Sequence, residues 1–498
     1  MSRLKRSIIE FPAHHLLIIL FFLLEGINEF YPNVTIAESL KLFGIFFTAA
    51  VALFFIGRLF SKDRAKSVLI SFLGIYVILY CRTIYQYYGK ALPGDQRISN
   101  THFFIVLGLF MILITILILR STTTASKKFS RFLNILFSIL ILLTSIGIGY
   151  KILTPGKQLT LLTQDIAGMN QPMFAKPNIY LLLFDEYQGD DGLKEFYGTT
   201  NPGPSPMLRQ KGFFVVPHSQ SNYNYTFYSV PSLMNMSYLN FSDGKLDFDL
   251  PRVISSLRTM KEENRFTSFL QQQGYTLINH SFLQMGNIPS PHRTLFVPHD
   301  GFTAIYSRTF PGWAQEDLLH FIPSNIVQKF SHTEFYQIYE YNKEVIAATE
   351  MTINERSSGP KFVYSHLLIP HPPMLTDSNG NLKNIRETMF ENNLASVSLA
   401  ASYTSYIKYA NRILGKMVTD IQKQDPAATI IFASDHGLRS YPDRQQYIFN
   451  NQCAVYIPGS KYEGFYDTLS LVNLLRLVLN NACGQKIPLL PDSHHLAK

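Results

Sequence analysis

The first third of the sequence contains five apolar runs, each close to the length that crosses a lipid bilayer. An α-helix needs about 20 apolar residues to span a hydrocarbon core of ~30 Å. Because a backbone in lipid must satisfy its own hydrogen bonds, such runs are expected to be helices. The sequence therefore predicts a five-helix transmembrane domain over residues 1–152, with spans at His14–Phe30, Leu40–Phe60, Ser67–Arg82, Thr101–Leu119 and Phe132–Tyr150.

The basic residues are concentrated in this N-terminal part. Residues 1–155 contain 16 Lys+Arg against 6 Asp+Glu, whereas the remaining residues contain 28 against 29. The formal net charge of +9 thus belongs to the membrane part, and the C-terminal domain lacks the basic excess that nucleic-acid binding requires. Basic side chains gather at the N-terminus and in the loops after the second and fourth spans, which predicts that these lie in the cytoplasm. We therefore expect a multi-pass protein of the inner (cytoplasmic) membrane, with a periplasmic or extracellular C-terminal domain.

Two features of the first span have alternative interpretations. Basic residues ahead of an apolar run also fit a cleavable signal peptide, but no small-residue cleavage site follows and four more apolar spans do. The polar side chains of Glu25, Asn28 and Glu29 near the outer end of the span have two alternative roles. They form a surface that holds a lipid head group, or they lie in the interface and against other helices.

The rest of the chain reads as a linker followed by a folded domain. Residues 153–175 are polar and contain Pro155-Gly156, which is typical of a linker. Residues 176–498 alternate short apolar runs with helical segments, and this alternation predicts an α/β/α sandwich. The stretch from His280 to Ser357 is irregular and aromatic-rich, so we expect an insertion near the substrate cleft. The predicted strands are Ile179–Phe184, Phe213–Val216, Tyr275–Ile278, Phe362–Leu368, Thr429–Ala433 and Val455–Ile457, and the predicted helices are Ser229–Leu239, Arg265–Gln273, Ser396–Gln422 and Leu469–Asn480.

Candidate ligands stand at the ends of two of these apolar runs. The first predicted strand stops at Asp185, and the fifth is followed closely by Asp435-His436. In open α/β sheets, binding sites lie beyond the carboxyl ends of the strands. We therefore expect these three side chains to converge there. Thr226 stands near the first turn of a predicted helix, where free backbone N–H groups favour an anion. Its hydroxyl needs a base or a metal to act as a nucleophile.

The order of these motifs resembles the alkaline phosphatase superfamily. An apolar strand ending at Asp185 is followed by Thr226-x-x-Ser-Val-Pro, then by His371-Pro-Pro, and then by Ser-Asp435-His436-Gly. The closest similarity is to the sulfatase-like, membrane-anchored branch that contains lipid A phosphoethanolamine transferases and lipoteichoic acid synthases. The resemblance implies that Thr226 is the nucleophile and that Asp185, Thr226, Asp435 and His436 bind a divalent metal. Hard oxygen ligands with one imidazole favour Zn or Mn.

Two histidines and one arginine are the expected substrate-binding residues. His366 and His371 end another apolar run, and His371 matches the family histidine that contacts the phosphoryl group or protonates a leaving group. Imidazole suits such acid–base work near neutral pH. The family's further histidine after the Asp-His-Gly motif has no counterpart here. Arg439 is the candidate anion contact in its place.

Four other residues have roles outside this set. Glu186 is adjacent to Asp185 in an extended run and is expected to point elsewhere. Ser229, one helical turn after Thr226, is the substitute nucleophile. Cys453 and Cys483 either form a disulfide or remain free thiols.

The resemblance implies an enzyme: a membrane-bound, metal-dependent transferase. It would move a phosphoryl-linked head group, of the phosphoethanolamine or phosphoglycerol type, from a phospholipid donor to an envelope glycan or lipid acceptor, through a phospho-threonine intermediate. The alternative is a phosphodiesterase or other hydrolase of the same fold. Formylglycine sulfatases need Cys or Ser followed by x-Pro-x-Arg, whereas Ser229-Val230-Pro231-Ser232 is followed by Leu233, so sulfatase activity is not expected. A third hypothesis, a non-catalytic envelope protein, is opposed by the presence of every core ligand type.

Overall fold

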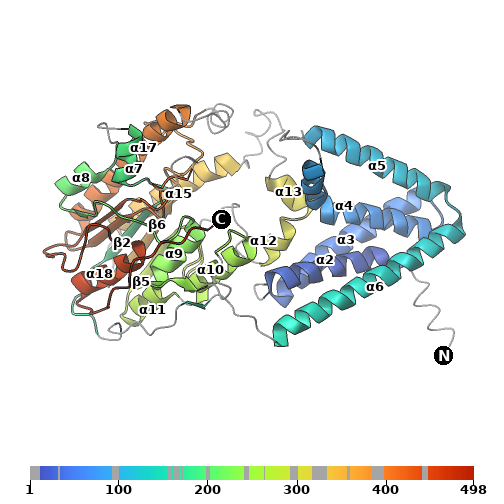
Figure 1. Ribbon diagram of the computed structural model, residues 1–498, viewed down its shortest axis with the longest axis horizontal. Coiled ribbons are helices and arrows are strands. Elements are labelled where there is room, and N and C mark those ends of the chain that lie inside the picture. The colour runs from blue at the N-terminus through green and yellow to red at the C-terminus, as the bar shows by residue number, and fades with distance from the viewer. Residues whose placement is uncertain are drawn as a thin grey trace. The chain divides into compact units, whose positions relative to one another are not determined.

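The computed structural model divides the chain into two compact units (Figure 1). One unit consists of Met1–Gly156 and Val297–Phe330, and the other of Lys157–Phe296 and Ser331–Lys498. The structure describes residues 12–31, 34–91, 100–153, 160–161, 169, 172–197, 202–240, 246–262, 264–291, 301–316, 334–355, 359–383, 397–439 and 447–497. Most of the predicted linker, 153–175, therefore lies outside the described residues.

The N-terminal unit is built from five helices in the region where five spans are predicted. Four of them are long and apolar enough to cross a membrane, which makes the chain a membrane protein. The remaining helix, α2, has 17 residues and is shorter than these four. The structure thus gives four helices of full spanning length among the described residues, against five predicted spans. The five helices are α2 (His14–Phe30), α3 (Ile36–Phe60), α4 (Arg64–Ala91), α5 (Asn100–Arg120) and α6 (Thr123–Leu153).

A segment from the middle of the sequence completes this unit. Helices α12 (Gly301–Tyr306) and α13 (Phe310–Glu316) belong to the same compact unit as the membrane helices. Trp313 is 1% exposed and its ring lies 4.9 Å from that of Tyr85 on α4 and 5.5 Å from that of Phe104 on α5. Trp313 of the predicted insertion is therefore buried against the N-terminal helices, and the expected position of this stretch near the substrate cleft stays a prediction.

The other unit contains a mixed six-stranded sheet in the order β3-β8-β7-β2-β6-β5. Strands β7, β2, β6 and β5 run parallel, and β8 is antiparallel to both β7 and β3. All six strands were predicted, with boundaries that differ by at most two residues. They are β2 (Ile179–Phe184), β3 (Phe214–Val215), β5 (Thr276–His280), β6 (Lys361–Leu367), β7 (Thr429–Ala433) and β8 (Cys453–Tyr456).

Helices cover both faces of this sheet, which confirms the predicted α/β/α sandwich (Figure 1). Every residue of β2, β6 and β7 is buried, as continuous apolar runs in parallel strands require. Cys453 and Cys483 are buried free thiols rather than a disulfide. One face carries α15 (Glu334–Asn354) and α17 (Val397–Gln424), and the other carries α9 (Thr226–Asn235), α10 (Leu250–Glu262), α11 (Arg265–Gln272) and α18 (Leu471–Cys483).

Candidate active site

The parallel strands β2 and β7 deliver three of the predicted ligands to one edge of the sheet. The two strands are hydrogen-bonded neighbours, with Leu183 of β2 paired with Ala433 of β7. Asp185 follows the end of β2, and Asp435 and His436 follow the end of β7. Because both strands end at the same edge, the side chains meet there, and all three are at most 2% exposed.

Thr226 completes a ring of four candidate ligands, in which three oxygen atoms lie near Nε2 of His436. Nε2 of His436 lies 3.4 Å from Thr226 Oγ1, 3.4 Å from Asp435 Oδ2 and 3.8 Å from Asp185 Oδ1. Ligands at 2.0–2.2 Å from a tetrahedral ion are separated by roughly 3.3–3.6 Å. Within the described residues, Asp185 Oδ1 and Asp435 Oδ2 are buried without a hydrogen-bond partner. Two buried carboxylate oxygens without a donor, facing an imidazole nitrogen, fit a divalent metal.

Hydrogen bonds from the surrounding backbone fix which atoms face this centre. Oδ1 of Asp435 accepts hydrogen bonds from the amides of Glu186 and His436, each 3.0 Å long, which leaves Oδ2 for a cation. Nδ1 of His436 donates to the carbonyl oxygen of Gly437 over 2.9 Å, so its Nε2 carries the lone pair. Burial, assisted by the charge of Arg439, lowers the pKa of His436 to about 4. The imidazole is therefore neutral at pH 7, as metal binding requires.

The two carboxylates of the ring have opposite pKa shifts. Burial and the nearby charge of Asp185 raise the pKa of Asp435 to about 7. Burial also opposes ionisation of Asp185, but the nearby His371, His366 and His436 hold its pKa below the ordinary value. Two carboxylates this close disfavour each other's ionised form. A divalent cation bound by both would stabilise the ionised form of each.

Thr226 is the first residue of α9, which begins three residues earlier than the predicted helix. The helix starts after Tyr225, whose extended backbone ends the preceding loop. Thr226 is 5% exposed and lies in the first turn of the helix. Ser229, the substitute nucleophile, is 1% exposed and its hydroxyl donates to the main-chain oxygen of Asp435 over 2.6 Å. The geometry therefore places Thr226, and not Ser229, in the ring.

Glu186, His371 and Arg439 form a second group beside the ring. Glu186 has φ of 56°, a left-handed conformation that interrupts the strand alternation after Asp185. Its carboxylate consequently points into the site instead of away from it, so the expectation for Glu186 is wrong. In the sequence, two adjacent acidic residues at a strand end indicated that Glu186 would point away from Asp185. The left-handed φ of Glu186 turns its side chain toward the site instead.

This second group is tied together by charge. Oε1 of Glu186 accepts from the backbone N–H of Arg439 over 2.6 Å, and Oε2 accepts from its guanidinium over 3.3 Å. Nε2 of His371 lies 3.1 Å from the same guanidinium nitrogen and 3.2 Å from Glu186 Oε2. Burial opposes ionisation of Glu186, but Arg439 and His371 lower its pKa below the ordinary value. The side chains of His371 and Arg439 are 31% and 25% exposed, so these predicted substrate-binding residues are accessible.

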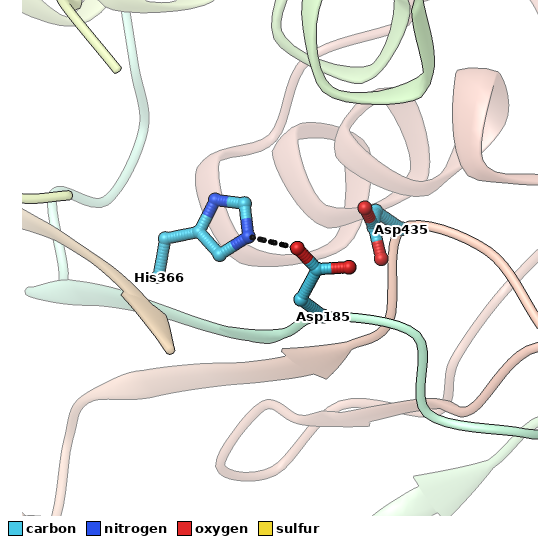
Figure 2. Close-up of side chains that lie close together, drawn as sticks. All are labelled: Asp185, His366 and Asp435. Atoms are coloured by element: carbon cyan, nitrogen blue, oxygen red, sulfur yellow. Dashed lines mark ion pairs between the residues drawn. The ribbon is translucent and has the colours of Figure 1, made fainter. Parts of the chain in front are cut away.

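His366 is placed differently from its predicted role in substrate binding. The side chain is fully buried, and Nε2 lies 3.8 Å from Asp185 Oδ2. Figure 2 shows Asp185 between His366 and Asp435, with one carboxylate oxygen turned toward the imidazole. Asp185, His366 and Asp435 lie close enough together to hold a metal ion, and so do Asp185, Glu186 and His371. Direct contact of His366 with a substrate is therefore not what the geometry supports.

Comparison with known proteins identifies the family of the C-terminal domain. The family model described as Sulfatase matches residues 177–477, which is more than half of the chain. None of the curated proteins matches the chain in sequence.

Several solved structures are similar to this one at low sequence identity. The lipooligosaccharide phosphoethanolamine transferase A (EptA) of Neisseria meningitidis has a TM-score of 0.42 and 12% identity over 95% of both chains. The C-terminal periplasmic domain of EcEptC from Escherichia coli, in complex with Zn, has a TM-score of 0.40 and 12% identity over 64% of this chain and 87% of that one. A putative sulfatase from Bacteroides thetaiotaomicron has a TM-score of 0.38 and 10% identity over 65% and 74%. From the match of the family model, the chain belongs to the Sulfatase family.

Proposed function

We propose that the chain is a membrane-bound, metal-dependent transferase. It moves a phosphoryl-linked head group, of the phosphoethanolamine or phosphoglycerol type, from a phospholipid to an envelope glycan or lipid. The observation that carries this proposal is the position of Thr226 Oγ1, 3.4 Å from His436 Nε2 within a ring of buried carboxylates. A hydroxyl in that position is a nucleophile held among groups able to bind a cation.

Asp185, Asp435, His436 and Thr226 would hold the divalent metal, with Zn or Mn as the ions that suit this donor set. When bound, the ion lowers the pKa of a coordinated hydroxyl and withdraws charge from a phosphoryl oxygen. Asp435 and His436 are oriented for this task by backbone hydrogen bonds, so they need no rearrangement.

The residues then divide the two half-reactions between them. In the first, Thr226 Oγ, already deprotonated, forms a bond to the donor phosphorus as the bond from phosphorus to the lipid glycerol oxygen breaks. His371, which is partly exposed, is placed to give that leaving oxygen a proton. In the second, His371 takes a proton from the acceptor hydroxyl, whose oxygen attacks phosphorus and releases Thr226. Arg439 supplies a guanidinium for the phosphoryl oxygens.

The membrane helices support a lipid donor, because the donor is then a component of the surrounding bilayer. We place the C-terminal unit on the periplasmic or extracellular side, on the strength of the basic residues in the loops after the second and fourth predicted spans. Hydrolysis by the same fold is the alternative, and differs only in that water takes the place of the acceptor hydroxyl.

Mass spectrometry of the full-length protein incubated with donor phospholipid tests the proposal. The expected result is a phosphoryl-linked adduct on Thr226, which accumulates in a His371→Ala variant. Thr226→Ala should abolish both adduct and transfer while keeping metal, and Thr226→Ser should keep some activity. Full transfer by Thr226→Ala would exclude the mechanism. Release of head group to water alone, with no acceptor product, would establish the hydrolase.

A further inference from the structure

His366 lies in an environment that is explained neither by the ring of four candidate ligands nor by the group of Glu186, His371 and Arg439. Its imidazole is fully buried, and its Nε2 has no hydrogen-bond partner among the described residues. The nearest acceptor recorded for that nitrogen is Asp185 Oδ2, at 3.8 Å. Oδ1 of the same carboxylate faces His436, so Oδ2 is the oxygen turned away from the ring.

The other ring nitrogen of His366 identifies its tautomer. Nδ1 lies 2.8 Å from the hydroxyl of Tyr364, which is the one hydrogen-bond partner of that hydroxyl among the described residues. Tyr364 is fully buried, and burial raises its pKa well above the ordinary value, so its proton is retained. A buried hydroxyl proton needs an acceptor. Tyr364 therefore donates to Nδ1, and the ring proton of His366 is on Nε2, where it points toward Asp185.

A direct metal-ligand role would break this hydrogen-bond pattern. A neutral imidazole that binds a cation through Nε2 carries its proton on Nδ1. Nδ1 would then donate to the Tyr364 oxygen, and the buried Tyr364 proton would lose its acceptor. Charge leads to the same conclusion, because Asp185 and Asp435 together balance one divalent ion, and Glu186 is already paired with Arg439. The pattern favours a hydrogen-bond donor to the carboxylate over a further ligand.

We propose, on the basis of the proposed metal site, that His366 is a positioning residue that acts through Asp185. Its Nε2–H faces Oδ2 of the carboxylate across 3.8 Å and attracts that oxygen, so that Oδ1 is left for the metal, and Tyr364 selects the tautomer that makes this possible. Main-chain and ring contacts keep the imidazole in place: Tyr341 donates to the His366 carbonyl oxygen over 2.6 Å, and the ring of Phe282 lies 4.9 Å away. The relay Tyr364–His366–Asp185 is thus built into the ends of two adjacent strands.

Zinc affinity of the full-length protein in detergent, measured by chelator competition, tests this relay. His366→Leu should weaken zinc binding by about 10–100-fold, the range typical for loss of a group that orients a metal ligand, while one zinc per chain still binds at saturation. His366→Gln places an amide N–H close to the former Nε2–H and should restore most of the affinity. Tyr364→Phe, which keeps the ring, should cause a smaller loss. His280→Leu is the matched control, because His280 bonds Thr352 at the end of neighbouring β5.

X-ray absorption at the zinc edge separates positioning from ligation. Wild type and His366→Leu should both show one imidazole per zinc, from His436. Two imidazoles in wild type that fall to one in His366→Leu would overturn the proposal and make His366 a ligand. Unchanged zinc affinity in both His366→Leu and Tyr364→Phe would also overturn it. Retention of zinc by an Asp435→Asn variant would instead refute the metal site itself, and with it the proposed function.

Discussion

Asp185 divides its two carboxylate oxygens between two histidines. Oδ1 lies 3.8 Å from Nε2 of His436, and Oδ2 lies 3.8 Å from Nε2 of His366. His436 follows strand β7 and His366 lies in strand β6, and these two strands flank β2 on either side in the sheet. The carboxylate that follows the central strand thus has one oxygen facing a histidine from each neighbouring strand. Substitutions on the two sides should therefore have separable effects.

Removing ligands on the β7 side should abolish metal binding. We expect an Asp435→Asn, His436→Ala double variant to contain less than about a tenth of the wild-type metal, because two of four donors are lost. Elemental analysis of the purified full-length protein measures this. His218→Ala is the control, since that histidine pairs with Asp191 at the surface. Metal content equal to wild type would place the ion elsewhere.

Metal affinity should depend on pH through Asp435. Its pKa is raised to about 7, so below that pH protons compete with the cation for the carboxylate. Apparent affinity should fall up to about tenfold for each pH unit below 7 and be nearly constant above it. His436, with a pKa of about 4, should not add to this slope until the pH approaches 4. Chelator competition between pH 5.5 and 8.5 measures the curve, and a flat curve would contradict the assignment.

The strand ends of the site could be predicted from sequence, because short continuous apolar runs are typical of strands that are buried on both faces. That pattern led us to expect Asp185, Asp435 and His436 at one edge of the sheet, and their role as metal ligands was implied by the resemblance to a known family. Thr226 also needed the resemblance to a known family, since a threonine near a helix start is common. Glu186 was missed because its side-chain direction depends on one left-handed φ that no periodicity records. The role of His366 depends on a hydroxyl two residues away and on burial.

The sequence also did not predict that residues 297–330 belong to the same unit as the N-terminal helices. Apolar length identified the N-terminal helices, but α12 and α13 are too short and too mixed in composition to reveal that they join them. Only their contacts show it. The ring of Phe302 lies 4.5 Å from the Lys41 ammonium, and Arg308 pairs with Glu29 over 2.8 Å. The sequence left two alternative roles open for Glu29, at a lipid head group or against other helices. In the structure its partner is Arg308.

The pair of Glu186 and Arg439 should affect turnover more than metal content. Arg439→Gln removes a partly exposed cation beside His371, and we expect transfer to fall by about 10²-fold through the loss of an anion contact. Metal content should be unchanged, because neither residue lies in the ring around His436. Arg412→Gln, at an exposed arginine over the ring of Tyr409, is the control. Equal losses of metal and activity in Arg439→Gln would mean that Arg439 supports the ring instead.

Trp313 should be important for the stability of the N-terminal unit. The side chain is buried between the rings of Tyr85, Phe103 and Phe104. Trp313→Ala should lower the free energy of unfolding of this unit by about 3–5 kcal/mol, the usual cost of a large cavity. Thermal unfolding in detergent, followed by proteolysis, measures the loss. Tyr87→Ala, at a position that is 69% exposed, should have little effect. A Trp313→Ala protein as stable as wild type would mean that α13 is not anchored there.

The last prediction concerns whether the short helix α2 crosses the membrane. Its 17 residues extend about 26 Å, slightly less than the ~30 Å hydrocarbon core. Eight of those residues are buried, because α2 packs against α3, α4 and α6. A helix surrounded by spanning helices is expected to span as well. Both four and five crossings leave the loop after Phe60 in the cytoplasm and residues beyond Leu153 outside, as the basic residues favour.

The N-terminus distinguishes the two topologies. Five crossings place it in the cytoplasm, whereas four crossings, with α2 not inserted, place it outside. We expect an N-terminal epitope tag to resist protease added to intact spheroplasts and to be cut after lysis, while a tag after residue 497 is cut in both. A reporter active only outside should be inactive when fused after Phe60. Cleavage of the N-terminal tag in intact spheroplasts would leave α2 out of the membrane, and an active Phe60 fusion would reverse the whole orientation.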